Sequence, residues 1–129
     1  MSKPAKTPQL SPVFPELVAP GGSLDKCLTA YAYGADACYV GLQSYGLRKS
    51  ADNLSFHELE YAKSKAIKLN KKLYVTLNAI AYESDLLAFD ATLKQLERIQ
   101  PHACIISDLG LAKHLKEHSS LSLHVSTQA

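Results

Sequence analysis

Short apolar segments alternate with amphipathic helical segments along most of this chain. The apolar segments are too short for helices and are rich in Val, Ile, Leu and Tyr; they span 16–19, 37–40, 73–77, 104–106 and 121–125. Apolar residues at helical spacing occupy the four stretches between them, near 24–32, 56–69, 85–99 and 109–118. Strict alternation of this kind predicts an α/β fold with a parallel sheet, because parallel strands need helical crossovers.

Local signals mark where several of these helices begin and end. Ser55 and Glu58 have the spacing of a capping box, and Leu54 with Leu59 has the spacing of a hydrophobic staple. Gly34 follows the first helical stretch as a C-terminal glycine. Ser107 or Asp108 is expected to cap the last helix.

Two arrangements of these units are open. Polar residues and glycines gather after the strands, which favours a parallel-stranded, partial (β/α)8 TIM-barrel-like domain with about five strands and four helices. The alternative is a complete five-stranded doubly wound sheet. We assign 1–15, which holds four prolines, to a flexible N-terminal tail, and 16–129 to a truncated barrel-like domain.

Composition excludes several classes of protein. The 14 basic and 12 acidic residues give a net charge of +2, which is no argument for nucleic-acid binding by bulk electrostatics. The sequence shows neither a membrane-spanning apolar run nor the apolar core of a secretory signal, so we expect a cytoplasmic protein without membrane contact. The lysines at 63, 65, 68, 71 and 72 are interpreted as a solvated face.

Metal binding by this chain is not expected. Cys27, Cys38 and Cys104 occupy apolar positions without a metal or redox spacing, and we interpret each as a reduced core thiol. His114 and His118 lie four residues apart, yet no acidic third ligand stands in register. Both also fall in a last helical turn, where the dipole favours them.

Polar residues that follow the predicted strands are the candidate substrate-binding groups. They are Arg48, Asn78, Asp108, Ser126 and Gln128. An arginine can hold a carboxylate or phosphate through two hydrogen bonds, and an asparagine can orient a base edge or a carbonyl. Plainer roles stay open for three of them: an ion pair for Arg48, a turn for Asn78 and a helix cap for Asp108.

Three further residues are possible site members. Gly21 and Gly22 precede a helix start, where free N–H groups can receive a phosphate, although a plain strand-to-helix turn explains them equally. His124 lies inside the last strand and is either a packed histidine or a proton carrier.

Seven motifs in register resemble the opening half of the peptidase U32 family, the collagenase-like proteins. They are ELVAPGGS (16–23), YGADA (33–37), GLR (46–48), ADN (51–53), YVTLN (74–78), SDLG (107–110) and HVSTQA (124–129). The resemblance implies a larger parent with a barrel-like N-terminal domain. It also implies downstream cysteines that hold an iron–sulfur cluster, none of which belongs to this chain.

The resemblance implies an RNA hydroxylation enzyme acting on a tRNA or rRNA base, with peptidase activity as the alternative. The sequence contains neither Gly-x-Ser-x-Gly nor His-Glu-x-x-His, so proteolysis has no support from motifs, and the catalytic residues remain unassigned. A third hypothesis is that the 129-residue chain is a non-catalytic, truncated fragment. We expect it to be inactive alone and to self-associate through exposed sheet edges.

Overall fold

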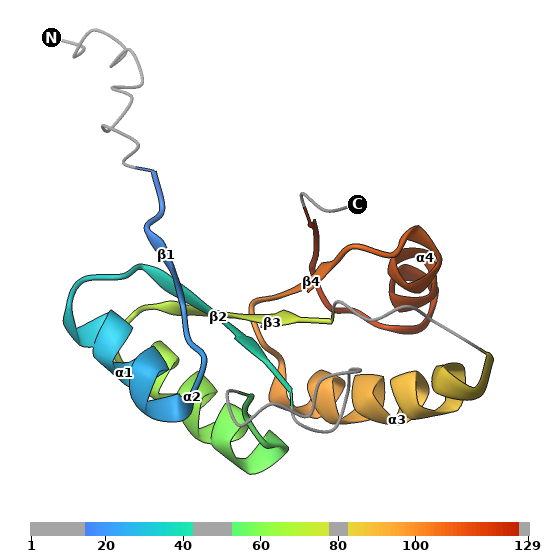
Figure 1. Cartoon of the computed structure of the whole chain (residues 1–129), viewed down its shortest axis with the longest axis horizontal. Helices are drawn as coiled ribbons and strands as arrows, with labels where there is room; N and C mark the ends of the chain where they lie inside the picture. Colours follow the sequence, from blue (N-terminus) through green and yellow to red (C-terminus); the bar gives the residue numbers. More distant parts are fainter. Residues whose placement is uncertain (1–14, 43–52, 78–82, 127–129) are drawn as a thin grey trace, which may run out of the picture.

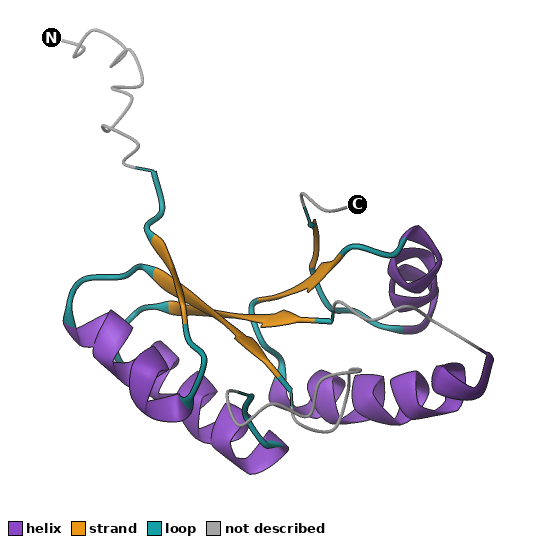
Figure 2. Ribbon diagram, in the orientation of Figure 1, coloured by secondary structure: helices purple, strands orange, loops and turns teal. Residues whose placement is uncertain are grey.

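The computed structural model describes residues 15–42, 53–77 and 83–126, and the predicted alternation of strands and helices is confirmed there. Figures 1 and 2 show the arrangement. The elements in chain order are β1 (Val18–Pro20), α1 (Leu24–Ala32), β2 (Ala37–Gly41), α2 (Phe56–Lys68), β3 (Lys72–Thr76), α3 (Glu83–Ile99), β4 (Ala103–Ile106), α4 (Leu109–His118) and β5 (Leu123–Val125). The predicted tail at 1–15 lies outside the described residues except for Pro15.

The five strands form one parallel sheet in the order β1-β2-β3-β4-β5. A doubly wound sheet would reverse its strand order at one point and carry helices on both faces. Here the order is sequential, and all four helices contribute to one core on one face of the sheet. The doubly wound alternative is therefore wrong, and the arrangement is that of a partial (β/α)8 barrel.

The face that the helices cover, called here the covered face, is densely packed. Strand residues Leu73, Val75 and Cys104 have no exposed surface, and Phe89 of α3 is equally buried in the same core. The other helix residues of this core include Cys27 and Tyr31 from α1, Leu59, Ala62 and Ala66 from α2, Leu93 and Leu96 from α3, and Leu111 and Leu115 from α4.

The opposite face of the sheet, called here the open face, is only partly covered. Its buried residues are Ala37, Tyr74 and Ala103, with Ile105 packed beside them. Tyr39 lies two residues after Ala37 in β2, therefore on the same face, and is 38% exposed. In a closed barrel this face would point to the interior and be filled by side chains from the remaining strands.

The helix ends follow the sequence signals. Ser55 accepts from the Glu58 N–H at 3.1 Å and Glu58 accepts from the Ser55 N–H at 3.1 Å, so the predicted capping box is present. Gly34 adopts a φ of +103°, which glycine tolerates at a helix C-terminus. Asp108 rather than Ser107 caps α4, by accepting from the Leu111 N–H at 3.0 Å.

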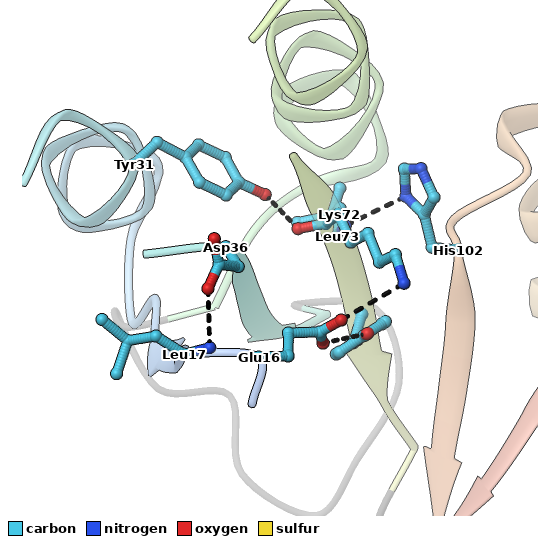
Figure 3. A network of polar contacts seen from close by, with 8 residues as sticks. Glu16, Leu17, Tyr31, Asp36, Lys72, Leu73 and His102 are labelled. Atoms are coloured by element: carbon cyan, nitrogen blue, oxygen red, sulfur yellow. Dashed lines mark hydrogen bonds and ion pairs between the residues drawn. The ribbon is translucent and has the colours of Figure 1, made fainter. Parts of the chain in front are cut away.

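Polar contacts at the amino-terminal edge of the sheet hold β1 and β3 in place (Figure 3). The Tyr74 hydroxyl donates to the Glu16 carboxylate, and Lys72 Nζ lies 3.2 Å from the same carboxylate. The Asp36 carboxylate accepts from the Leu17 N–H at 2.8 Å. These bonds connect the segment before β1 to residues that lie 19 to 58 positions later in the chain.

The same edge also ties helices and later strands to β3 (Figure 3). The Tyr31 hydroxyl donates to the Lys72 carbonyl at 2.7 Å, and the Leu73 N–H donates to His102 Nδ1 at 3.0 Å. Burial, together with the nearby Lys63 and Lys72, lowers the pKa of His102, which keeps the ring a neutral acceptor. Lys63 and Lys72, two of the lysines interpreted as a solvated face, therefore lie near the amino-terminal edge of the sheet, away from the carboxyl-terminal ends of the strands.

None of the helices in the described ranges is long and apolar enough to cross a bilayer.

Candidate functional site

The segments that follow the strands meet at the opposite, carboxyl-terminal edge of the sheet. The Leu77 N–H donates to the Ile105 carbonyl at 2.9 Å, and the Ser126 N–H donates to the Ile106 carbonyl at 2.9 Å. The ladder thus continues past β3 and β5, and Ser126 stays beside the end of β4. This edge is where ligands bind in parallel β/α proteins.

The turn after β1 is shaped by close packing. A Cβ at Gly21 would overlap Cys38 Sγ and would lie 3.0 Å from Cys27 Cβ and 3.1 Å from Val40 Cγ1. The Gly21 N–H donates to the Tyr39 carbonyl at 2.8 Å and is therefore occupied within the sheet. Packing accounts for glycine at position 21, and a phosphate-binding role for Gly22 stays a prediction.

Ser23 completes this turn by capping α1. Its side chain accepts from the Lys26 N–H at 3.2 Å, which satisfies one of the free donors at the helix start. The first β/α turn therefore has the local chemistry of a capped helix entry, as the plainer of the two sequence interpretations proposed.

A polar group at the ends of β2 and β3 was not singled out from the sequence. Asn53 Oδ1 lies 2.5 Å from where a Cβ of Gly41 would stand, so the glycine lets the amide approach the strand end. Thr76 ends β3, and its hydroxyl donates to the Val40 carbonyl at 3.3 Å. Thr76 lies two residues after Tyr74 in β3 and therefore on the same, open face of the sheet. A polar residue on this face at the end of a strand is the sequence signal that would have identified Thr76.

The structure places Asp108, Ser126 and His124 at or near the carboxyl-terminal edge. Asp108 acts as the α4 cap, the plainer role foreseen for it, and one of its oxygens is engaged by the Leu111 N–H. Ser126 follows β5 directly. The His124 ring is exposed, shares the open face with Ile105 and meets Tyr74 edge-on with ring centroids 5.0 Å apart.

Three predicted site residues, Arg48, Asn78 and Gln128, lie outside the described residues. Their proposed roles stay predictions. Among the described groups, the carboxyl-terminal edge offers hydroxyl, amide and carboxylate side chains, which suit hydrogen bonding to a polar substrate.

The described residues do not fit a metal cluster. Cys27, Cys38 and Cys104 are buried in α1, β2 and β4, and no three His, Cys, Asp or Glu side chains within the described ranges could hold an ion. His114 Nε2 instead lies 2.5 Å from Asp90 Oδ1, and its ring stacks on His118 at 4.1 Å. His114 therefore links α4 to α3 through Asp90, a contact that the sequence did not predict.

Comparisons with known proteins agree with this architecture. The pattern of peptidase family U32 matches residues 22–129. The chain is 37% identical over 116 residues to tRNA hydroxylation protein P of Escherichia coli, covering 89% of this chain and 26% of that protein. It is 36% identical over 115 residues to tRNA hydroxylation protein P1 of Bacillus subtilis, covering 88% and 27%. The chain spans about a quarter of the length of these relatives.

Among solved structures, the U32 peptidase Mk0906 superposes with a TM-score of 0.71. The superposition covers 90% of this chain and 50% of that one, at 15% sequence identity. At this identity the likeness concerns the fold alone.

Proposed function

The chain belongs to peptidase family U32, and from this membership we propose that it forms the opening part of the barrel of an RNA hydroxylation enzyme. The whole protein would hydroxylate a base of tRNA or rRNA in the cytoplasm. The 129 residues would supply one wall of the substrate site and would be inactive by themselves.

The observation that carries this proposal is the similarity to tRNA hydroxylation proteins over nearly the whole chain, at 36–37% identity. The solved U32 peptidase shares the fold at only 15% identity, so it carries no argument for proteolysis. The absence of a Gly-x-Ser-x-Gly or His-Glu-x-x-His motif from the sequence points the same way.

We assign the substrate site to the carboxyl-terminal edge of the sheet. Arg48 would grip an anionic group of the RNA with its planar guanidinium, because two parallel hydrogen bonds to a phosphate are strong and directional. Asn78, Gln128 and Ser126 would orient the base through hydrogen bonds. Asp108 would accept a hydrogen bond from the base with the carboxylate oxygen that does not cap α4. The iron–sulfur cluster would be bound by cysteines outside these 129 residues.

The proposal is tested in the organism that carries the gene. Deletion of the gene should remove one hydroxylated nucleoside from digests of total tRNA or rRNA, measured by mass spectrometry, and the intact gene should restore it. Restoration by an Arg48→Ala allele should fall by about tenfold or more, since hydrogen bonds to a charged group contribute about 1.5–3 kcal/mol.

Arg98→Ala is the matched control. Arg98 is exposed on α3, where it donates to Gln95 at 3.0 Å, and its loss should leave the modification unchanged. Nucleoside masses that are identical with and without the gene would contradict the proposed function.

A further inference from the structure

Two cysteine side chains meet beneath the first β/α turn. Cys27 of α1 and Cys38 of β2 both have 0% exposed surface, and each thiol shifts the pKa of the other. The backbone geometry agrees independently, because the point where a Gly21 Cβ would stand is 3.0 Å from Cys27 Cβ and overlaps Cys38 Sγ. Both side chains therefore converge on the space that Gly21 leaves open.

We propose that Cys27 and Cys38 are an oxidation site, at which a hydroperoxide such as hydrogen peroxide produces a reversible disulfide between α1 and β2. A disulfide requires Cβ atoms about 3.5–4.5 Å apart and sulfurs about 2.05 Å apart. Cys27 Cβ and Cys38 Sγ both border the space beside Gly21, so side-chain rotations bring the two sulfurs together there, and the missing Cβ at Gly21 leaves room for them.

The chemistry assigns different roles to the two sulfurs. The hydrogen bond from the Cys38 thiol lowers the pKa of Cys27, against the opposing effect of burial, while the same bond and burial raise the pKa of Cys38. The Cys27 thiolate is therefore the first nucleophile. It attacks one peroxide oxygen, the O–O bond breaks, and hydroxide leaves to take up a proton as water.

The second step closes the bridge. Cys38 attacks the sulfur of the Cys27 sulfenic acid, the S–S bond forms, and the S–O bond breaks. The departing hydroxyl group of the sulfenic acid takes the Cys38 proton and leaves as a second water. In total the two thiols lose two electrons, which reduce the peroxide, and thiol reductants reverse the reaction.

Burial determines the rate of this reaction. Peroxide reaches the thiols only when α1 moves off β2, so oxidation is slow in the native protein and accelerates under mildly denaturing conditions. Once formed, the bridge fixes α1 against β2, directly under the turn from Gly21 to Ser23 at the carboxyl-terminal edge. The inference does not depend on the proposed function.

The test uses the purified 129-residue chain, treated with hydrogen peroxide, alkylated and digested without reduction. Trypsin releases both cysteines in one peptide, because it cleaves after Lys26 and Arg48. That peptide should carry no alkyl groups and should lack two hydrogens. Chymotrypsin cleaves at Tyr31 and Tyr33, between the cysteines, so the resulting peptides should stay joined until a reductant separates them.

Matched variants assign the bridge. Cys104→Ser is the control, because Cys104 is also fully buried but lies in β4, away from the pair, and this variant should retain the bridge. Cys38→Ser should abolish it. The wild-type peptide map does not depend on how well the variants fold. The proposal is overturned if peroxide yields only intermolecular disulfides, bridges to Cys104, or sulfinic acid at single thiols.

Discussion

The two faces of the sheet differ in how far the described chain completes them. On the covered face, strand residues such as Leu73 and Val75 are fully buried in a core to which all four helices contribute. On the open face, only the cluster around Ala37, Tyr74 and Ala103 is buried, and Val18 and Tyr39 keep 39% and 38% of their surface exposed. One face is therefore a finished core, while the other is the partly filled interior of a barrel.

This difference separates what stabilises the chain from what positions its site. Burial of apolar surface between sheet and helices provides most of the stability, because the hydrophobic free energy scales with the area removed from water. The open face contributes less burial, and its rims carry the polar groups: the Glu16 contacts at the amino-terminal edge and Thr76 and Ser126 at the carboxyl-terminal edge. Four predictions test this contrast.

The largest effect is expected on the covered face. Phe89→Ala should lower the free energy of unfolding by about 3–5 kcal/mol, because it empties a fully buried site shared by α3 and the sheet. Tyr39→Ala on the open face should cost about 1 kcal/mol, since much of that side chain is already in contact with water. Urea denaturation of both variants measures the two values, and equal losses would contradict the contrast between the faces.

The next effect concerns the tight packing beneath the first turn. Gly21→Ala should destabilise by about 1–3 kcal/mol, because the new methyl overlaps Cys38 Sγ. Adding Cys38→Ala should recover part of that loss by removing the sulfur. Gly110→Ala is a milder comparison: its Cβ would lie 3.1 Å from Asp108 Oδ1, the oxygen that caps α4, so thermal denaturation should show a smaller loss than for Gly21→Ala. No coupling between positions 21 and 38 would show that the contact is relaxed in solution.

The covered face was also the part of the molecule that the sequence predicted well. Apolar residues at helical spacing marked the helical stretches whose Leu59, Leu96 and Leu115 are fully buried, and a capping box at Ser55 placed the start of α2. Such signals are local: they lie within one or two turns of the chain, and the burial of one helix side leaves a periodic trace.

Contacts between distant segments left no such trace. Glu16 and Tyr74 are 58 residues apart, and Asp90 and His114 are 24 apart. From the sequence, Cys27 and Cys38 were interpreted as two separate core thiols, because their proximity arises only when α1 packs on β2. At the candidate site, the sequence placed polar residues after the strands, but the closeness of Asn53 to Gly41 depends on how the loop returns to the sheet.

A smaller effect is expected for association. We predict that the chain self-associates as its concentration rises, because β1 and β5 are the edges of the described sheet and Val125 of β5 is 59% exposed. Val125→Lys should weaken association by about tenfold, equivalent to about 1.4 kcal/mol, as measured by sedimentation velocity. Leu87 of α3 is more exposed than Val125 but lies away from the sheet edges, so Leu87→Lys should leave the association unchanged. A monomer at every concentration would contradict this prediction.

The smallest effect is expected at the amino-terminal edge of the open face. The Tyr74 hydroxyl, and to a lesser degree Lys72, hold the pKa of Glu16 below its ordinary value of 4.5. A depressed carboxyl pKa adds stability above the ordinary value, and this stability is lost as the pH falls through the lower, folded value. Glu16→Gln should therefore cost well under about 1 kcal/mol at neutral pH, since the pair lies near solvent. The difference from wild type should vanish in acid, as urea denaturation at neutral and at low pH will show. A Glu16→Gln loss that persists unchanged at low pH would mean that the carboxylate charge does not hold β1 against β3.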